Sequence, residues 1–325
     1  MSGMGALFRG VDWRRMAADY LGMLLVLAAL VGIFSAAADN FLTRQTFFMT
    51  VNQIPSAIVV AVGMTYVLII AGIDLSVGSI LALSGAALGV ALVRWEWPLL
   101  PALGLCLAAG LGCGLVNGFV SARWSLPSFI VTLGMLEMAR GGAYLATNSQ
   151  TMYIGAAIER VGDAHILGFS LPFLLALAVV AVGQLVLTRT VFGRHMLAIG
   201  ANEEVVRLSG INPRPVKIAV FGLSGLLAGL GAVIQCSRLA SADPNAGAGM
   251  ELQAIAAVVI GGTSLMGGRG SVVRSFFGVL IISVLGVGLA QIGAQEPTKR
   301  LVTGLVIVAA VIFDQYRERL GRRVA

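Results

Sequence analysis

The amino-acid sequence predicts an all-α membrane protein, a polytopic bundle of about ten transmembrane helices with discontinuous half-helices and an internal repeat. Hydrophobic residues make up 58% of the 325 residues and charged residues only 11%, and the mean hydropathy is +0.93. Because roughly a quarter of the residues in ordinary soluble domains are charged, this chain has too few charged residues to form the surface of a water-soluble protein. The apolar residues gather in runs of about membrane length, and a glycine pattern recurs at the ends of two of them.

The apolar runs are delimited by the length of about 20 residues that a membrane-spanning helix needs. They are 21–38, 51–71, 75–93, 99–120, 127–147, 170–188, 216–236, 252–262, 271–291 and 301–313. The first run has no small-residue cleavage site, so we expect it to remain as a span. The run 252–262 is too short to cross alone and is typical of half of a re-entrant or discontinuous element. An even number of spans places both termini on one side of the membrane.

The net charge of +7 comes from basic residues in three places. Arginines precede the first apolar run, follow the last one, and cluster with Lys217 around 189–215. Cationic residues accumulate on the cytoplasmic loops of membrane proteins. We therefore expect residues 1–20, 189–215 and 314–325 to be cytoplasmic, and the loop 148–169 to face outward. No DNA- or RNA-binding motif accompanies the charge, so nucleic acid is not an expected partner.

Two apolar runs carry glycines at intervals of four residues. In lipid, small residues let helix backbones approach closely, so this spacing predicts helix–helix packing. The positions are Gly110, Gly114 and Gly118 in one run and Gly225 and Gly229 in another.

The spacing Gly-x-x-Leu-x-x-Gly occurs twice, as the first glycine motif at 72–78 and the second glycine motif at 262–268, 190 positions later. Broken helices at matching places in two halves are the best sequence indication of the transport path in a membrane transporter. A further set of matches has an offset of 170. Either the second half is shortened after its motif or these matches arise by chance in a glycine-rich chain. They pair Gly118, Pro127 and Gly134 with Gly288, Pro297 and Gly304.

Charged side chains within the apolar runs are few. Asp74 lies inside the first glycine motif, where it either caps a helix that begins at Leu75 or contacts a polar ligand or a moving gate. Glu137 and Arg140 stand three residues apart on one predicted helix, where they can pair. Such a pair is either structural or lines a polar path. The scarcity of buried charge favours an uncharged polar solute over ion- or proton-coupled transport.

The sequence argues against enzymatic chemistry within the chain. It has no Gly-x-x-x-x-Gly-Lys-Ser/Thr phosphate loop, so ATP hydrolysis is not expected here. The three cysteines stand in apolar runs without metal-ligand spacing, and both histidines fall in predicted loops. No catalytic residue, metal site or cofactor is therefore expected, and a membrane-embedded enzyme is disfavoured.

The basic segment 189–215 contains a short stretch that favours a helix. Asn202 can cap that helix, and Glu203 and Glu204 stand in its first turn, at the positive end of the helix dipole. Gly210 ends it. The segment is either a solvated connector or a docking element for a soluble partner.

Four segments resemble the ribose-type sugar permeases of bacterial ABC importers, and the likeness runs from about residue 50 to 315. They are GIDLSVGS, LPSFIVTLGMLEMARGGAYL, IGANEEVVRLSGI and AIAAVVIGGTSLMGGRGSV. The branched-chain amino-acid permeases share looser glycine patterns but not GIDLSVGS. The chain departs from the ribose group in NSQTMYIG and LAQIGAQEPTKR, which are places for a changed substrate or a changed binding-protein contact.

The resemblance implies that residues 1–325 form a single permease domain of the bacterial inner membrane. It implies a homodimer, two cytoplasmic ATPase subunits that bind ATP, and a periplasmic sugar-binding protein, which together import a monosaccharide or polyol by alternating access. A stand-alone channel or secondary carrier is the alternative. The implied ATPase-coupling residues are Gly200, Asn202, Glu203, Glu204, Gly210 and Ile211. The residues placed near the path are Gly72, Asp74, Ser76, Gly78, Gly262, Thr263, Ser264, Gly267 and Gly268.

Overall fold

The computed structural model describes residues 13–166 and 168–323, which are mostly helical. The helices are α1 (Trp13–Ala37), α2 (Arg44–Gln53), α3 (Pro55–Ile69), α4 (Val77–Gly89) with the π-helical turn η1 (Val90–Arg94), α5 (Leu99–Trp124), α6 (Ser128–Thr147), α7 (Ala156–Asp163), α8 (Leu171–Arg189), α9 (Val191–Ala201), α10 (Glu203–Leu208), α11 (Arg214–Leu239), α12 (Met250–Ile260), α13 (Val272–Gln291) and α14 (Glu296–Arg323). Four two-residue strands form two antiparallel pairs, β1 (Met152–Tyr153) with β4 (Ser241–Ala242), and β2 (His165–Ile166) with β3 (Phe169–Ser170).

Within the described residues, six helices are long and apolar enough to cross a membrane. They belong to α1, α4 with η1, α5, α8, α11 and α13. The pair α2 and α3 adds a seventh if its 44° bend lies within one span. Helices α6 and α14 fall outside this set, and α12 is a shorter apolar helix. A mostly helical fold with several helices apolar enough to cross a membrane is thus confirmed, whereas about ten spans stays a prediction.

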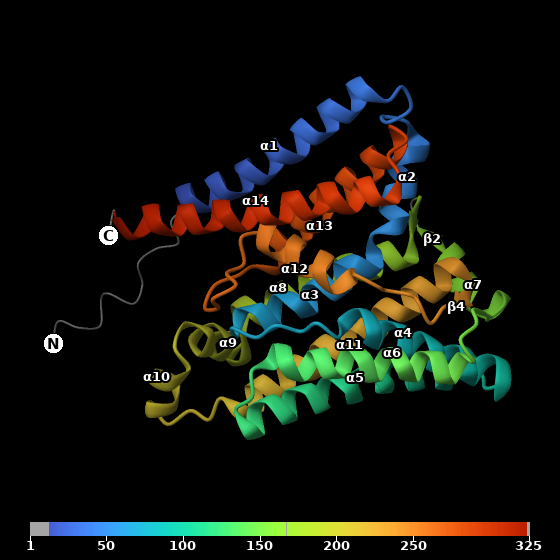
Figure 1. Cartoon of the computed structure of the whole chain (residues 1–325), viewed down its shortest axis with the longest axis horizontal. Helices are drawn as coiled ribbons and strands as arrows, with labels where there is room; N and C mark the ends of the chain where they lie inside the picture. The colour runs from blue at the N-terminus through green and yellow to red at the C-terminus, as the bar shows by residue number, and fades with distance from the viewer. Residues whose placement is uncertain (1–12, 167, 324–325) are drawn as a thin grey trace.

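The elements are distributed between two ends of the long axis (Figure 1). Helices α9 and α10 lie at one end, where α1 begins and α14 stops, while β2, β4 and α7 lie at the other. The loop 189–215 and the described part of the C-terminal tail therefore share one end, and 148–169 lies at the opposite one. Residues 1–12 of the expected cytoplasmic N-terminus and the last two tail residues lie outside the described residues.

Helix α3 is the central helix, and nearly every residue in it is buried. A helix that is apolar on all sides is stable only when other helices surround it, and α3 contacts α8, α11, α12 and α13. Its polar side chains bond to these neighbours. Thr65 Oγ1 donates to Ser275 Oγ of α13 at 2.8 Å, and the Tyr66 hydroxyl donates to the Gly183 carbonyl oxygen of α8 at 2.7 Å.

Helices α5 and α11 pack through their glycines, as the spacing predicts. A Cβ atom built on Gly110 would overlap the carbonyl oxygen of Gly225 and lie 3.1 Å from the Cα of Gly229. A Cβ atom on Gly114 would likewise overlap the carbonyl oxygen of Phe221. The two backbones are therefore close enough to exclude any side chain at these positions.

Replacing Gly114 by leucine is expected to separate α5 from α11, because overpacking a close contact costs about 1–3 kcal/mol or more. The midpoint of thermal unfolding in detergent should fall by several degrees. Gly112, two residues earlier on the same helix, has no atom within 4 Å of a built Cβ. Gly112→Leu should therefore unfold like the parent, and an equal loss in both variants would contradict the packing assignment.

Candidate functional site

Helix α3 ends in the first glycine motif through a Schellman motif, with Ala71 in the left-handed region at φ 58°. The Gly72 amide donates to the Val67 carbonyl and the Ala71 amide to the Leu68 carbonyl, both at 2.9 Å. These two bonds satisfy carbonyls that have no partner within the helix. The chain then stays non-helical until α4 begins at Val77.

The predicted cap by Asp74 of a helix starting at Leu75 is wrong. Helix α4 begins two residues later, and its N-cap Ser76 makes no side-chain cap bond. The fully buried Asp74 carboxylate instead accepts from the Ser76 amide at 3.0 Å, the Ser76 hydroxyl at 2.6 Å and the Ser224 hydroxyl of α11 at 3.0 Å. Asp74 therefore ties the break to α11, because burial of a carboxylate requires such donors.

Side chains from α5 and α6 complete the polar surroundings of this break. Ser128 Oγ accepts from the Ile73 amide at 2.9 Å, and Thr132 Oγ1 accepts from the Leu75 amide at 3.1 Å. Asn117 Nδ2 donates to the Ser76 hydroxyl at 2.9 Å. Irregular backbone at membrane depth is tolerated only when such groups satisfy it.

Helix α12 ends in the second glycine motif with the same geometry. The Thr263 amide donates to the Val258 carbonyl at 3.1 Å and the Gly262 amide to the Val259 carbonyl at 2.7 Å. The left-handed residue is Gly262, at φ 79°, which makes its counterpart Ala71 and not Gly72. The two helix ends therefore align at a sequence offset that is one residue larger than the offset of 190 between the two glycine motifs.

The two sequence offsets do not describe one repeated succession of helices. The offset of 190 places α4 on the start of α13, while the offset of 170 places α5 on α13 as well. One helix cannot be the counterpart of both, so a shortening of the second half, which would leave α4 without a counterpart, stays a prediction. The supported likeness is the shared helix ending of α3 and α12.

The second glycine motif meets α3 and α9 at one point, which we call the glycine junction (Ile69, Gly200 and Gly268). The Gly268 amide donates to the Ile69 carbonyl at 2.9 Å, which satisfies another free carbonyl at the end of α3. A Cβ atom on Gly200 would overlap that same carbonyl oxygen and lie 2.5 Å from the Gly268 nitrogen. Of the coupling residues, Gly200 thus lies directly against both breaks.

Glycine packing extends the junction on both sides. A Cβ atom on Gly267 would lie 2.8 Å from both the Ala71 Cβ and the Gly200 carbonyl oxygen, and one on Gly268 would lie 2.9 Å from the Ala201 Cα. Both glycines have positive φ, at 84° and 75°, which other residues rarely adopt. The contact is therefore made of backbone on all three sides.

The end of the segment 189–215 follows the predicted pattern. Asn202 Oδ1 accepts from the Val205 amide at 3.0 Å, which confirms it as the N-cap of α10, and Glu203 and Glu204 stand in the first turn. Gly210 follows the helix with φ 81°, and Ile211 packs on the core.

Two salt bridges fix the acidic residues of α10. Glu204 bonds to Arg207 within the helix, and Glu203 to Lys217 of α11, both at 2.6 Å. The hydrogen bond that the Arg207 guanidinium donates to the Glu204 carboxylate raises the pKa of Arg207 above its usual value. The Glu204–Arg207 bridge is largely exposed and the Glu203–Lys217 bridge is partly exposed, so they orient α10 without adding much stability.

The predicted pairing of Glu137 with Arg140 is wrong. Among the residues that the structure describes, no salt bridge joins them, and Glu137 is exposed. The Arg140 guanidinium donates instead to the carbonyls of Pro244 and Ala246, at 2.6 and 2.9 Å. Its partners lie about a hundred positions away in the chain, so helical spacing could not identify them.

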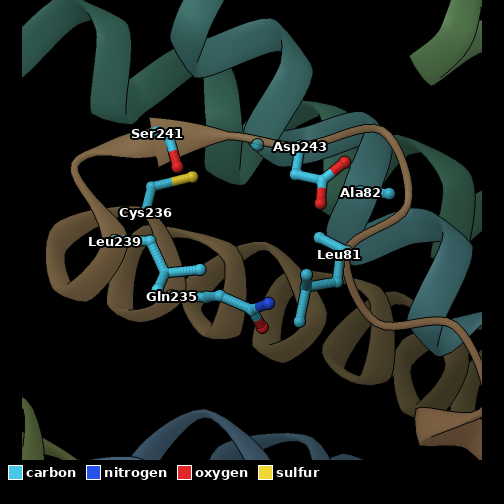
Figure 2. A pocket seen from close by; sticks show the side chains of 9 residues that line it. Leu81, Ala82, Gln235, Cys236, Leu239, Ser241 and Asp243 are labelled. Carbon is cyan, nitrogen blue, oxygen red and sulfur yellow. The ribbon is translucent and has the colours of Figure 1, made fainter. Parts of the chain in front are cut away.

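A pocket lies between α4, the end of α11 and the segment after β4, on the side of the molecule away from α10 (Figures 1 and 2). Figure 2 shows Asp243 and Gln235 on opposite sides of this space, with Leu81 and Leu239 beside them. Asp243 Oδ1 accepts from the Asn245 amide at 2.9 Å. None of the predicted path residues lines this pocket.

Sequence reasoning missed the side chains that hold the breaks. Each is a polar residue with mostly apolar neighbours in its helix, which is the signal that could have marked it. Gln184 of α8 is a further example, since its Oε1 accepts from the Val273 amide at the start of α13 at 3.3 Å. The others are Asn117, Ser128, Thr132 and Ser224.

Comparison with known proteins gives a consistent family. A family model described as "Branched-chain amino acid transport system / permease component" matches residues 46–311. The ribose import permease protein RbsC of Escherichia coli (strain K12) is 39% identical over 300 residues, covering 91% of this chain and 93% of the relative. The L-arabinose transport system permease protein AraH of the same strain is 35% identical over 332 residues, covering 99% and 98%.

A third relative names another sugar. The fructose import permease protein FrcC of Rhizobium meliloti is 33% identical over 310 residues, covering 92% of this chain and 86% of the relative. No solved structure matches the chain. The relatives are permease components and not enzymes, and the helices are apolar enough for a multi-pass membrane protein. The chain therefore belongs to the branched-chain amino acid transport system / permease component family, within which it is similar to sugar import permeases.

Proposed function

We propose that this chain is the membrane subunit of an ATP-driven importer for a monosaccharide or related polyol. Two copies form the translocation path, a separate cytoplasmic ATPase supplies the energy, and a periplasmic binding protein delivers the sugar. Both termini and the segment 189–215 are cytoplasmic. This chain binds no ATP itself.

The glycine junction is the observation that carries the proposal. An ATPase can reorient a membrane path only if its motion reaches the helices that form the path. Gly200 belongs to the segment that the family resemblance assigns to ATPase docking, and it packs on the end of α3 and on Gly268 of the second glycine motif. Because all three sides are backbone, a displacement of α9 reaches α3 and the second glycine motif without being absorbed by side-chain rotation.

Helix α10 supplies the docking surface at that end of the molecule. The side chains of Val205 and Leu208 are 55% and 77% exposed, although both are apolar. Glu203 and Glu204 stand beside them, and the N-cap Asn202 fixes the start of the helix. An apolar patch with a charged rim is typical of a protein interface, and the ATPase is its proposed occupant.

Substrate moves from the end that carries β2, β4 and α7 toward the end that carries α10 (Figure 1). The loaded binding protein docks on the first of these ends. ATP binding and hydrolysis at the other end move α10, and the two broken helices then alternate between outward- and inward-open arrangements. Gly72, Asp74, Ser76 and Gly78 in one break, and residues 262–268 in the other, form the moving parts.

The test is purification of the tagged chain from its host in mild detergent, followed by reconstitution in liposomes. Recovery of an ATPase and a periplasmic binding protein, with ATP-dependent uptake of labelled ribose, arabinose or fructose, is the expected result. Uptake that proceeds without ATP, or recovery of the chain alone even after crosslinking, would move the assignment to a channel or secondary carrier.

Asn202→Pro is expected to uncouple ATP hydrolysis from uptake. The change removes the cap of α10 and the bond from the Asn202 amide to the Ala198 carbonyl, and φ of −165° does not suit proline. Loss of the cap alone costs about 0.5–2 kcal/mol. Uptake should fall about tenfold or more while the ATPase still hydrolyses ATP. The combined changes Glu203→Lys and Glu204→Lys should have a similar effect on uptake, because each replaces a salt bridge by two like positive charges.

Asn202→Asp is the matched control, since aspartate caps helices as well as asparagine does. It should retain parental uptake and ATP consumption per sugar. Normal uptake by Asn202→Pro would remove the docking role from α10.

A further inference from the structure

We propose that Arg140 of α6 is a positioning residue for transport, which fixes where the short helix α12 begins. The role rests on the proposed function, because α12 matters through the path it helps to form. Arg140 contacts the segment 243–249 between β4 and α12, which we call the re-entrant turn.

The re-entrant turn satisfies only part of its own backbone: the Asp243 and Asn245 carbonyls accept from the Ala246 and Ala248 amides, at 3.0 and 3.3 Å, whereas the Pro244 and Ala246 carbonyls accept from a side chain of another helix. It is irregular, with Gly247 and Gly249 at φ of 69° and 81°, and α12 begins without a side-chain cap. The segment runs from the end that carries β4 toward the middle of the molecule, where α12 lies (Figure 1). Pro244 is buried and Ala246 half-buried, and an unpaired carbonyl away from water costs several kcal/mol, so these two carbonyls need donors from elsewhere in the protein.

Arg140 supplies those donors. Its Nη1 atom donates to the Pro244 carbonyl at 2.6 Å and to the Ala246 carbonyl at 2.9 Å. One turn further along α6, the Tyr144 hydroxyl donates to Asn245 Oδ1 at 2.7 Å. Residues four apart on a helix share one face, so this face of α6 holds three successive residues of the turn.

A second contact fixes the same turn against the first break. A Cβ atom built on Gly78 would overlap the Gly247 carbonyl oxygen and lie 2.6 Å from the Glu251 carboxylate of α12. The start of α12 is thus held between α4 and α6. Its other end leads into the second glycine motif, and Gly268 of that motif bonds to Ile69 in the glycine junction.

Helix α12 therefore joins two fixed points. It has 11 residues, which corresponds to about 16 Å along the axis. The re-entrant turn holds its first end, and its last residue leads into the second glycine motif, which bonds to Ile69 through Gly268, so a shift of the turn is passed along α12 to that motif. Arg140 contributes by placing the turn, through carbonyl dipoles and, among the described residues, without an acidic partner.

The first measurement is sugar uptake in liposomes that contain the ATPase and binding protein, with labelled ribose, arabinose and fructose as probes. Arg140→Met should lower the maximal rate about tenfold or more, because it leaves two carbonyls unpaired. The binding-protein concentration at half-maximal rate should stay unchanged. Arg140→Lys should recover part of the rate, since its ammonium can donate to the same two carbonyls as Nη1 does but from a differently shaped side chain. Met138→Leu, an exposed neighbour on α6, should match the parent.

The second measurement does not depend on transport. Ala246→Cys places a thiol on the re-entrant turn at a half-buried site, with Cys113→Ala removing the half-buried native thiol. A membrane-impermeant maleimide should label this thiol slowly beside Arg140 and at least about fivefold faster beside Arg140→Met. Arg140→Gln serves in both measurements if the methionine variant does not elute as a folded protein.

Three outcomes would overturn the proposal. The first is parental uptake by Arg140→Met, and the second is a loss of uptake with unchanged labelling. The third is an equal loss of uptake in Glu137→Gln, which would support an ion pair between Glu137 and Arg140 as the source of the effect. If the parent chain itself does not transport, the proposed function fails, while the labelling still reports on how Arg140 places the turn.

Discussion

Replacing Gly200 by alanine is expected to stop coupled transport almost completely. The added methyl group overlaps the Ile69 carbonyl oxygen and approaches the Gly268 nitrogen to 2.5 Å, and neither is a flexible side chain. Overpacking costs about 1–3 kcal/mol and is relieved here only by moving α9 away from α3. Uptake into liposomes should therefore fall about tenfold or more, while the partner ATPase still hydrolyses ATP.

Gly134→Ala is the matched control for this experiment. Gly134 lies within α6, and nothing stands within 4 Å of a built Cβ, so the added methyl meets no neighbour. It should transport like the parent and be at least as stable, because alanine favours a helix by about 1 kcal/mol over glycine. Full transport by Gly200→Ala would show that the junction does not carry motion.

Replacing Asp74 by alanine is expected to release the first break. Three donors lose their acceptor, namely the amide and hydroxyl of Ser76 and the hydroxyl of Ser224. Leaving a buried donor unsatisfied costs about 1–3 kcal/mol, so the folded state should lose at least about 3 kcal/mol. The midpoint of thermal unfolding in detergent measures the loss, and uptake should fall with it.

Asp74→Asn separates the hydrogen bonds from the charge. An asparagine side-chain oxygen still accepts the two bonds from Ser76, so the break should hold its shape and lose less stability. If Asp74→Asn instead loses as much stability as Asp74→Ala, the negative charge holds the break and not the acceptor geometry. Unchanged stability in both variants would contradict the role of Asp74 altogether.

The fold was predictable wherever a long apolar run decides a helix. The run 271–291 nearly coincides with α13, and 99–120 begins with α5. The run 51–71 was less accurate, because Pro55 lacks an amide donor and starts a new helix, which produces the bend between α2 and α3. Hydropathy reports only the apolar character of a segment, so it could not detect that bend.

The candidate site was predictable only where its geometry is local. Asn202 was identified as a cap because it bonds to a residue three positions away. Arg140 was assigned wrongly because its partner Pro244 comes from a distant segment, and Asp74 because α4 begins at Val77 and the hydroxyl of distant Ser224 supplies one of its donors. The glycine junction was out of reach for the same reason, since backbone contacts leave no side-chain pattern to recognise.

The glycine junction also has a consequence for biosynthesis. Its three backbone segments come from near residues 69, 200 and 268, so it cannot form until most of the chain has left the ribosome. Until then the Ile69 carbonyl at the end of α3 lacks its hydrogen-bond donor, the Gly268 amide, although α3 and α9 have already been synthesised. In a nascent chain that stops before residue 268, we therefore expect α9 and α10 not to be held in their final position. A partner that binds α10 would then assemble preferentially with completed chains.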